Sequence, residues 1–208
     1  MIIAKIPRIL SKTFSSLTWN LPSEDKEVYL TFDDGPTPEI TSKVLDVLES
    51  KKAKATFFCL GNNVEANPDL YQQILDRGHS VGNHSYSHVK GFSMSKTEYL
   101  KNIQKAANII DSRLFRPPYG RILPGQVREV KKEFQIIMWS VLSVDYNPKI
   151  SGEQVYRNVI ENIHPGCIIV FHDSQKASKN LFYALPRVLD FLADNKYKMK
   201  SIPSSLSY

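Results

Sequence analysis

Side chains that could carry out chemistry stand shortly after short apolar runs of the chain. Five segments share this arrangement: Asp33-Asp34 after VYLTF, His84 and His88 after HSVG, Arg116 after Leu114-Phe115, Asp145 after QIIMWS, and His172-Asp173 after CIIVF. Apolar runs without strict alternation are typical of parallel strands that are buried on both faces. Because parallel α/β sheets and barrels form their sites at the carboxyl ends of the strands, we expect these polar groups to meet at one mouth.

Asp33 and Asp34 are adjacent acids in the segment Asp-Asp-Gly-Pro, which has two interpretations. Aspartate, glycine and proline all favour turns, so the segment could be a turn and nothing more. Two carboxylates at the end of a strand repel each other, however, and a bound cation or an arginine would relieve that repulsion. One carboxylate could then bind a metal ion while its neighbour acts as a base.

His84 and His88 stand four residues apart in the segment HSYSH. A helical turn would place both imidazoles on one face, and neutral imidazoles at that spacing are familiar zinc ligands. Such a pair is weak evidence by itself, but a third ligand such as Asp34 would complete a metal site. Two other histidines, His79 and His164, are interpreted as structural.

Arg116 and His172 each have an ordinary alternative to a functional role. Arg116 opens the segment Arg-Pro-Pro-Tyr-Gly, whose prolines cannot continue a helix, so we expect an extended, stiff wall for a groove. The alternative is a proline-rich loop in which the arginine is solvated. His172 ends a buried strand, where a lone histidine is more often a hydrogen-bonded core residue than a proton donor.

The elements that must position these side chains alternate between apolar runs and helical patterns. Strands are expected at residues 28–32, 55–60, 79–82, 114–115, 135–140 and 167–171. Helices are indicated by Thr37 as N-cap before Pro38, by capping boxes at Ser95/Glu98 and Ser151/Gln154, and by apolar spacing over 179–194, with residues 61–63 between elements. This alternation predicts βα units and a parallel sheet, and roughly six to eight units would form a compact, irregular barrel.

Composition favours one globular domain with a mildly basic surface. The chain has 208 residues, of which 42% are hydrophobic, and this is enough for a single sizeable core. The formal net charge of +6 weakly favours an anionic polymer as partner, but a solvated basic surface explains it as well. There is no basic stripe with interleaved aromatic residues, so we expect no nucleic-acid partner. The cysteines, Cys59 and Cys167, lie in apolar runs and are expected to be buried.

Together these segments resemble the polysaccharide deacetylases, carbohydrate esterase family 4. The five motifs of that family can be placed in order at TFDDGP (31–36), HSYSH (84–88), RPPY (116–119), Asp145-Tyr146 and Val170-Phe171-His172. The fourth motif departs from the family in having tyrosine where tryptophan is more usual. The fifth has valine where leucine is usual, two residues before the histidine.

The resemblance implies an α/β fold, namely a distorted, incomplete (β/α) barrel of about seven parallel strands with a groove at the strand C-terminal ends. It implies one divalent metal ion, zinc by default with cobalt or nickel as substitutes, bound by Asp34, His84 and His88. The resemblance also implies that Asp33 is the general base and His172 the general acid, supported by Arg116 and Asp145 respectively. It further implies that the Tyr119 N–H contacts the oxyanion and that Pro118 and Val170 contact the substrate.

The function that the resemblance implies is metal-dependent hydrolysis of a linear amide. The expected reaction removes N-acetyl groups from amino sugars of a polysaccharide or oligosaccharide, either peptidoglycan-like or chitin-like. Two alternatives are an acetyl esterase acting on an O-acetylated polysaccharide and a catalytically inactive glycan-binding relative. We expect an N-acetylated glycan as substrate, no nucleic acid, no membrane contact and a monomer.

The domain expectation is a short N-terminal extension at residues 1–24 and a single catalytic domain at residues 25–208. The first ten residues, MIIAKIPRIL, are too short to span a bilayer and lack the apolar region and cleavage site of a signal peptide. The cytoplasm is therefore the default location, although the implied substrate class suggests the cell envelope.

Overall fold

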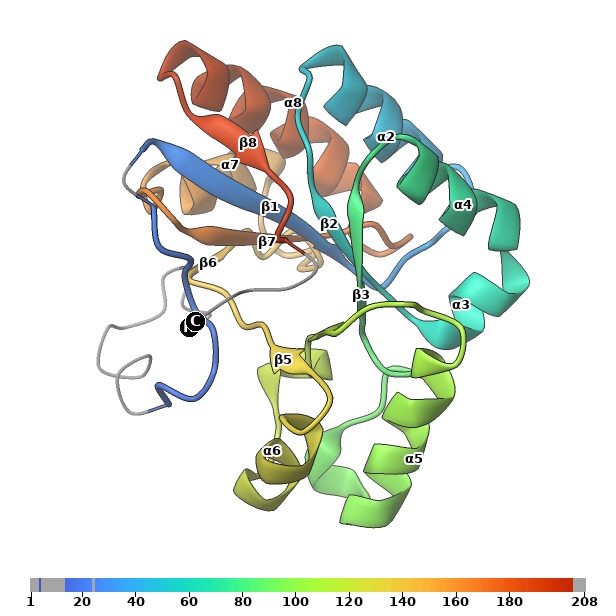
Figure 1. The fold of residues 1–208 in the computed structure, drawn as a ribbon. Coiled ribbons are helices and arrows are strands. Elements are labelled where there is room, and N and C mark those ends of the chain that lie inside the picture. Colours follow the sequence, from blue (N-terminus) through green and yellow to red (C-terminus); the bar gives the residue numbers. More distant parts are fainter. Residues whose placement is uncertain (1–3, 5–13, 24, 204–208) are drawn as a thin grey trace.

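The computed structural model describes residues 4, 14–23 and 25–203, which form a curved parallel sheet surrounded by helices (Figure 1). The strands are β1 (Glu27–Asp33), β2 (Thr56–Cys59), β3 (Ser80–Asn83), β4 (Leu114–Phe115), β5 (Gln135–Ile136), β6 (Val141–Leu142), β7 (Ile168–His172) and β8 (Lys198–Lys200). They are arranged in the order β5-β4-β3-β2-β1-β7-β6, and β8 pairs with β1 outside this path. Every pair among these strands is parallel. The predicted incomplete (β/α) barrel is therefore confirmed.

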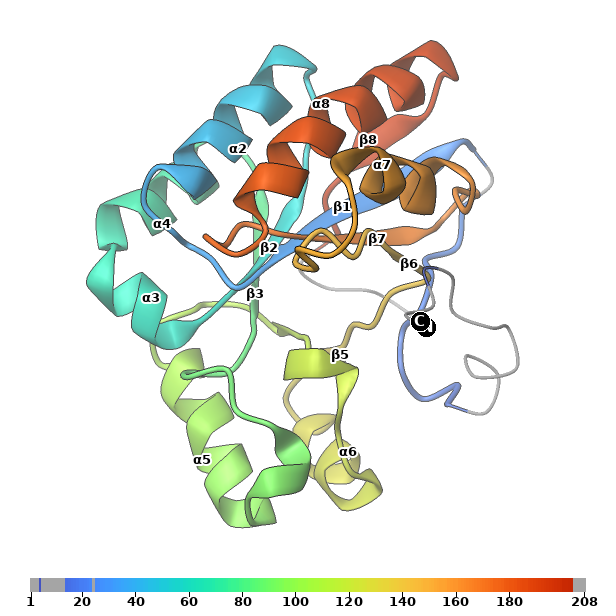
Figure 2. The same ribbon diagram turned by 180° about the vertical axis from the view of Figure 1, so that it is seen from behind.

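Helices cover the sheet and connect its strands. They are α2 (Ile40–Ser50), α3 (Gly61–Ala66), α4 (Pro68–Asp76), α5 (Lys96–Ala107), α6 (Pro124–Val130), α7 (Gly152–Ile160) and α8 (Ser178–Asp194), with 3-10 turns η1 (Gly91–Ser93) and η2 (Pro118–Gly120). Helices α2, α7 and α8 lie on one side of the sheet, whereas α5 and α6 pack against each other beside β3 and β5 (Figure 1 and Figure 2). No helix in the described ranges has the length and apolar character needed to cross a bilayer.

Successive side chains of β1 point alternately into the main core cluster and to the opposite face of the sheet. Leu30 and Phe32 are fully buried in the main core cluster. Thr31 and Asp33 point to the opposite face, because successive side chains of a strand alternate between faces. Both are buried as well, so their polar atoms need partners inside the barrel.

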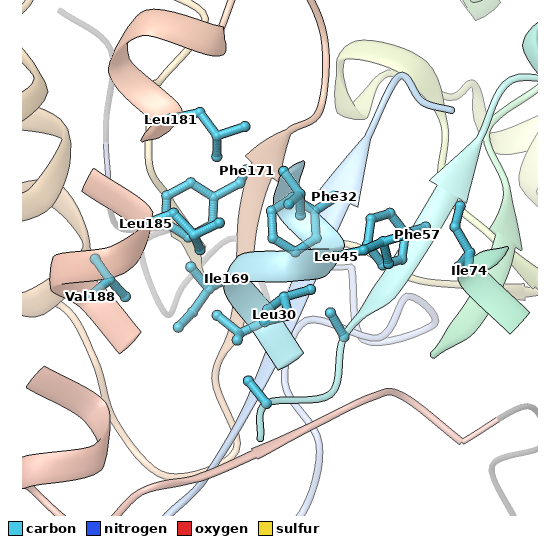
Figure 3. Close-up of a cluster of buried hydrophobic side chains, with 14 of the residues drawn as sticks. Leu30, Phe32, Leu45, Phe57, Ile74, Ile169, Phe171, Leu181, Leu185 and Val188 are labelled. Carbon is cyan, nitrogen blue, oxygen red and sulfur yellow. The ribbon is translucent and has the colours of Figure 1, made fainter. Parts of the chain in front are cut away.

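The core on the helical side is built around three stacked phenylalanines. The ring of Phe32 stacks on Phe57 at a centroid distance of 5.0 Å and on Phe171 at 5.9 Å. Figure 3 shows Phe171 beside Leu181 and Leu185 of α8, and Phe57 on the other side of Phe32, near Leu45 and Ile74. Full burial of each large apolar side chain contributes about 1.5–3 kcal/mol, so this cluster fixes β1, β2 and β7 as a rigid platform. Both cysteines are free and buried, as predicted.

Three local predictions were wrong. Helix α2 begins at Ile40 after the N-cap residue Glu39, two residues later than the predicted cap at Thr37. The hydroxyl of Thr41 accepts a hydrogen bond from Thr37 N at 2.7 Å, so residues 37–39 form a turn instead. Gly61 begins α3 rather than a connection. The predicted strand 135–140 is interrupted after β5, because the next backbone carbonyls face the buried guanidinium of Arg116 instead of a neighbouring strand.

The predicted helix caps were largely correct. Ser95 and Glu98 form a reciprocal capping box at α5. The Ser151 hydroxyl caps α7 by accepting from Gln154 N at 3.1 Å, as predicted. The Gln154 side chain does not return this bond but donates to Asn158 Oδ1 at 3.0 Å along the same helix.

The segment that precedes β1 packs with Leu17–Trp19 against the β4–β5 end of the domain and with Asn20 and Leu21 against the residues directly before β7. Leu17 and Trp19 are buried in a cluster with Phe115 and Phe134. Thr18 N donates to the carbonyl of Ile136 at 2.9 Å. This segment therefore contributes apolar contacts to the second of the core clusters.

Candidate active site

The carboxyl ends of β1 and β7 place two of the predicted residues side by side. Asp33 is the last residue of β1 and His172 is the last residue of β7. The two are Cα partners in the parallel register of these strands. Because the strands end at the same edge of the sheet, residues far apart in the sequence share one site.

Arg116 is fully buried and is held by four hydrogen bonds. Its Nη1 donates to Asp33 Oδ1 and to Thr31 Oγ1, each at 2.7 Å. Its Nε and Nη2 donate to the carbonyls of Ile137 and Met138 at 3.2 and 3.0 Å. Burial of a charge is tolerated only with pairing of this kind. The expected contact between Arg116 and Asp33 is present, and it places a fixed positive charge beside that carboxylate.

Asp34, His84 and His88 converge at the same mouth. The Nε2 atoms of His84 and His88 lie 3.7 and 3.2 Å from Asp34 Oδ1. One possible ligand atom from each residue lies within 4.8 Å of the others. The Nδ1 atom of His84 lies 2.8 Å from the carbonyl oxygen of Arg116. Since a carbonyl only accepts, Nδ1 carries the proton and the lone pair of Nε2 faces Asp34.

These three side chains fit a divalent metal ion. Asp34 Oδ1 is buried and has no hydrogen-bond partner within the described ranges, although His88 Nε2 is 3.2 Å away. Burial lowers the pKa of His84, which keeps its imidazole neutral, as a metal ligand must be. A lone pair and an unpartnered carboxylate oxygen that face each other would be stabilised by a cation between them.

A loop, not a helix, brings the two histidines together. Ser85 and His88 have positive φ angles of 69° and 53°, so the predicted helical turn over this segment was wrong. Asparagine side chains supply the hydrogen bonds that a helix would have made: Ser85 N donates to Asn83 Oδ1 and Tyr86 N to Asn102 Oδ1, each at 2.8 Å. The loop therefore holds the two rings 5.2 Å apart between centroids.

His172 is paired with a buried carboxylate. Its Nδ1 lies 2.7 Å from Asp145 Oδ1, and its backbone N–H donates to Asp145 Oδ2 at 2.8 Å. Burial alone would lower the pKa of His172, but the charge and hydrogen bond of Asp145 outweigh it and raise that pKa to about 9. His172 is consequently an imidazolium at neutral pH, in contact with the residue that the family resemblance implied as its support.

Pro117 is extended, as the prolines suggested, but Pro118 and Tyr119 lie in the 3-10 turn η2, so the prediction holds only for the first part of the segment. Tyr119 has a φ angle of 60°, its side chain is 54% exposed, and its ring lies 4.6 Å from the ring of His88. Gly120 also has a positive φ of 64°, and a Cβ at this position would lie 2.5 Å from the Trp139 ring. Glycine is thus needed here for the turn to approach the tryptophan.

A groove of about 650 Å³ opens over these residues. Val170 is buried at its base, in a small apolar cluster with Leu142 and Val144. The groove combines apolar, aromatic and charged side chains: Asp33, Asp34, His84, His88, Lys90, Tyr119, Arg121, Trp139, Leu142, Tyr146, Val170, His172, Ser174 and Lys176.

Asp173 was noted in the sequence, but its position was not anticipated. It is fully buried and accepts hydrogen bonds from Gly35 N at 3.1 Å and Thr41 Oγ1 at 2.5 Å. Burial raises its pKa to about 7. Asp173 thereby ties the turn after Asp34 to the first turn of α2. Its place directly after His172 was the only signal in the sequence.

Two histidines lie outside the site and have structural partners, as expected. His79 Nδ1 accepts from the backbone N–H of Ala55 at 3.2 Å, and burial lowers its pKa to about 4. His164 Nε2 lies 3.0 Å from Asn20 Oδ1.

Comparison with known proteins connects this geometry to glycan deacetylation. The family model described as "Polysaccharide deacetylase" matches residues 20–139. A peptidoglycan-N-acetylglucosamine deacetylase of Bacillus cereus is 36% identical over 88% of this chain and 69% of its own length. A second protein of that name and organism is 34% identical over 92% of this chain and 93% of its own.

Solved structures are similar over the same range. A crystal structure of a peptidoglycan N-acetylglucosamine deacetylase superposes with a TM-score of 0.87 at 33% identity, and the match covers 96% of each chain. The peptidoglycan deacetylase PdaC from Bacillus subtilis superposes with a TM-score of 0.78 at 31% identity, covering 88% of this chain and 90% of that one.

Proposed function

Because this chain belongs to the polysaccharide deacetylase family, we propose that it hydrolyses the N-acetyl group of an amino sugar in a peptidoglycan-like glycan. The observation that carries the proposal is that two ion pairs meet at one groove, one holding a carboxylate and the other holding a protonated histidine. Arg116 holds Asp33 at 2.7 Å, and Asp145 holds His172 at 2.7 Å, with Asp34 and its two histidines at the same mouth. A carboxylate base and an imidazolium acid are the two groups that amide hydrolysis needs.

Each residue has a definite task in this proposal. Asp33, whose carboxylate is held by Arg116 at 2.7 Å, takes a proton from the water that attacks the acetamide carbon. The backbone N–H of Tyr119 donates to the oxygen on which negative charge develops, and one such donor is worth about 3 kcal/mol in comparable sites. His172, as imidazolium, protonates the departing amine, which is otherwise a poor leaving group. Val170 and Pro118 shape the acetyl end of the groove.

We propose zinc as the ion that Asp34, His84 and His88 hold. One carboxylate and two neutral imidazoles are a typical open zinc ligand set, and cobalt or nickel would substitute because such sites discriminate weakly among these ions. Bound there, the ion would supply Lewis-acid chemistry by lowering the pKa of water and polarising the acetyl carbonyl.

We propose that residues 25–208 act as one catalytic domain, with residues 1–24 before it. A single sheet runs through strands from β1 to β8, which supports one domain over that range. Leu17, Trp19 and Leu21 of the preceding segment are buried against this domain.

The test is release of acetate from a glycan panel. The protein is assayed on peptidoglycan strands, N-acetylglucosamine oligomers and acetylated xylan, as purified, after chelation, and after chelation with zinc, cobalt or nickel restored. We expect acetate from the amide substrates and recovery with added metal. Preference for acetylated xylan would favour the esterase alternative, and no acetate from any substrate would favour the inactive glycan-binding alternative.

A further inference from the structure

Three cations line the groove without an acidic partner. Lys90, Arg121 and Lys176 are exposed and contribute to its lining. None of them forms an ion pair with any described residue, whereas Lys132 and Arg157 elsewhere on the surface pair with glutamates. Like charges gathered around one opening repel each other, and a negatively charged ligand relieves that repulsion.

The two lysines lie over different aromatic rings of the groove, one beside His88 and the other beside His172. Lys90 Nζ lies 5.3 Å from the Tyr119 ring, which contacts His88. Lys176 Nζ lies 5.6 Å from the Tyr146 ring, which is 4.9 Å from the ring of His172. The His88 ring and the His172 ring are thus each next to a tyrosine ring that has a lysine ammonium group over it.

The acids of the groove do not neutralise these cations. Apart from Asp33 and Asp34, no described acidic residue lines the groove. Asp33 is already paired with the buried Arg116, and Asp34 faces the imidazoles of His84 and His88. Arg116 therefore balances the charge of Asp33, a metal ion bound at Asp34, His84 and His88 would balance that of Asp34, and the exposed rim keeps its positive charge.

We propose that this groove recognises a glycan strand that carries carboxylates on the sugars next to the one that loses its acetyl group. The aromatic rings would support the sugar rings, and Lys90, Arg121 and Lys176 would contact the pendant carboxylates on either side. The inference deepens the proposed function and rests on it. The carboxylate could belong to the sugar itself or to a short acidic peptide attached to it.

The test compares a charge-removing groove variant, K90Q/R121Q/K176Q, with a control of equal charge change, K43Q/K101Q/R128Q. Lys43, Lys101 and Arg128 are exposed on α2, α5 and α6 and do not line the groove. The substrates are oligosaccharides of one length: neutral N-acetylglucosamine oligomers, a strand with free sugar carboxyls, the same strand with these carboxyls amidated, and a peptide-bearing strand.

We expect the unmodified protein to show a higher kcat/KM on carboxylate-bearing strands than on neutral ones, and this preference should shrink as salt is raised. In the groove variant the ratio of charged to neutral kcat/KM should fall about tenfold, and in the control it should not change. A drop seen with free sugar carboxyls assigns the contact to the sugar, and a drop seen only with the peptide-bearing strand assigns it to the peptide.

An unchanged ratio in the groove variant, or an equal drop on the amidated strand, would overturn the inference. Affinity for the charged and neutral strands, measured by calorimetry, separates this outcome from failure of the proposed function. If no substrate releases acetate, the proposed function fails, and the affinity ratio still decides whether the groove prefers carboxylates.

Discussion

His84 and His172 are the same residue type at the same edge of the barrel, yet they are held in opposite protonation states. His84 is bonded through Nδ1 to the backbone carbonyl of Arg116, and burial lowers its pKa. His172 is bonded through Nδ1 to the carboxylate of Asp145, which overcomes burial and raises its pKa to about 9. The group that meets Nδ1 therefore decides whether the buried imidazole is neutral or charged.

The largest effect is expected from the neutral histidine. His84→Ala removes one of three metal ligands, so acetate release should fall about a thousandfold or more on every substrate. Metal content, measured by elemental analysis, should fall with it. His164→Ala lies outside the site and should change neither quantity. Full activity after thorough chelation would contradict the metal assignment.

Substitutions of the two adjacent acids, Asp33 and Asp34, should also differ in their effects on metal content and activity. Asp33→Asn removes the proposed base but leaves the ligands, so metal content should persist while activity falls about 10²–10⁴-fold. Asp34→Asn should lose metal as well. If Asp33→Asn is the variant that loses metal, the two roles are exchanged.

The charged histidine should matter only where a proton is needed. His172→Ala should reduce amide hydrolysis by about 10²–10⁴-fold, because the amine departs poorly without a proton. Acetate esters with activated leaving groups should be affected much less, unlike in His84→Ala. Equal losses on amide and activated ester would argue against a general acid at this position.

Asp145→Asn tests whether the carboxylate sets the charge of His172. A general acid works below its pKa, so activity should decline as pH rises through about 9. Without the carboxylate the pKa of His172 falls, and the alkaline limb of the kcat/KM profile should move to lower pH by about 1–3 units. Asp69→Asn, an exposed acid on α4, serves as control. An unmoved limb would mean that another group controls it.

Asp173 extends the comparison to a carboxyl group whose pKa is raised. Because its pKa is about 7 in the folded protein and near 4 when unfolded, the folded state binds more protons between these values. Its contribution to stability is therefore present at low pH and is lost as pH rises from about 4 to 7. Asp173→Asn keeps an acceptor for Gly35 N and removes this titration. Melting temperatures across that range should fall less steeply with pH in the variant.

The sequence predicted most of the parallel sheet because most of its strands are apolar on both faces and are followed by polar residues, whereas the exposed strand β8, Lys-Met-Lys, was not predicted. It predicted less well where tertiary partners replaced local rules. Arg116 donates hydrogen bonds to the carbonyls of Ile137 and Met138, and this interrupts the expected strand. Asparagine side chains stabilise a loop where the spacing of His84 and His88 suggested a helix.

The contacts between the proposed catalytic residues were easier to predict than the identity of the residues that line the groove. The family resemblance implied the Arg116–Asp33 and Asp145–His172 contacts, and they agree with the need of ionised groups near a strand end for partners. Lys90, Arg121 and Trp139 come from irregular segments, whose path no periodicity describes, so their presence in the lining could not be read from the chain.

The buried arginine also constrains how this protein could evolve. Arg116 joins Asp33 to the carbonyls that follow β5, so the same cation holds the proposed base and links that side of the barrel. Loss of Asp33 alone would strand a buried charge, at a typical penalty of about 3–5 kcal/mol. A lineage that abandoned catalysis would therefore be expected to replace Arg116 together with the acid, and the order of those two substitutions would decide whether its intermediates stay folded.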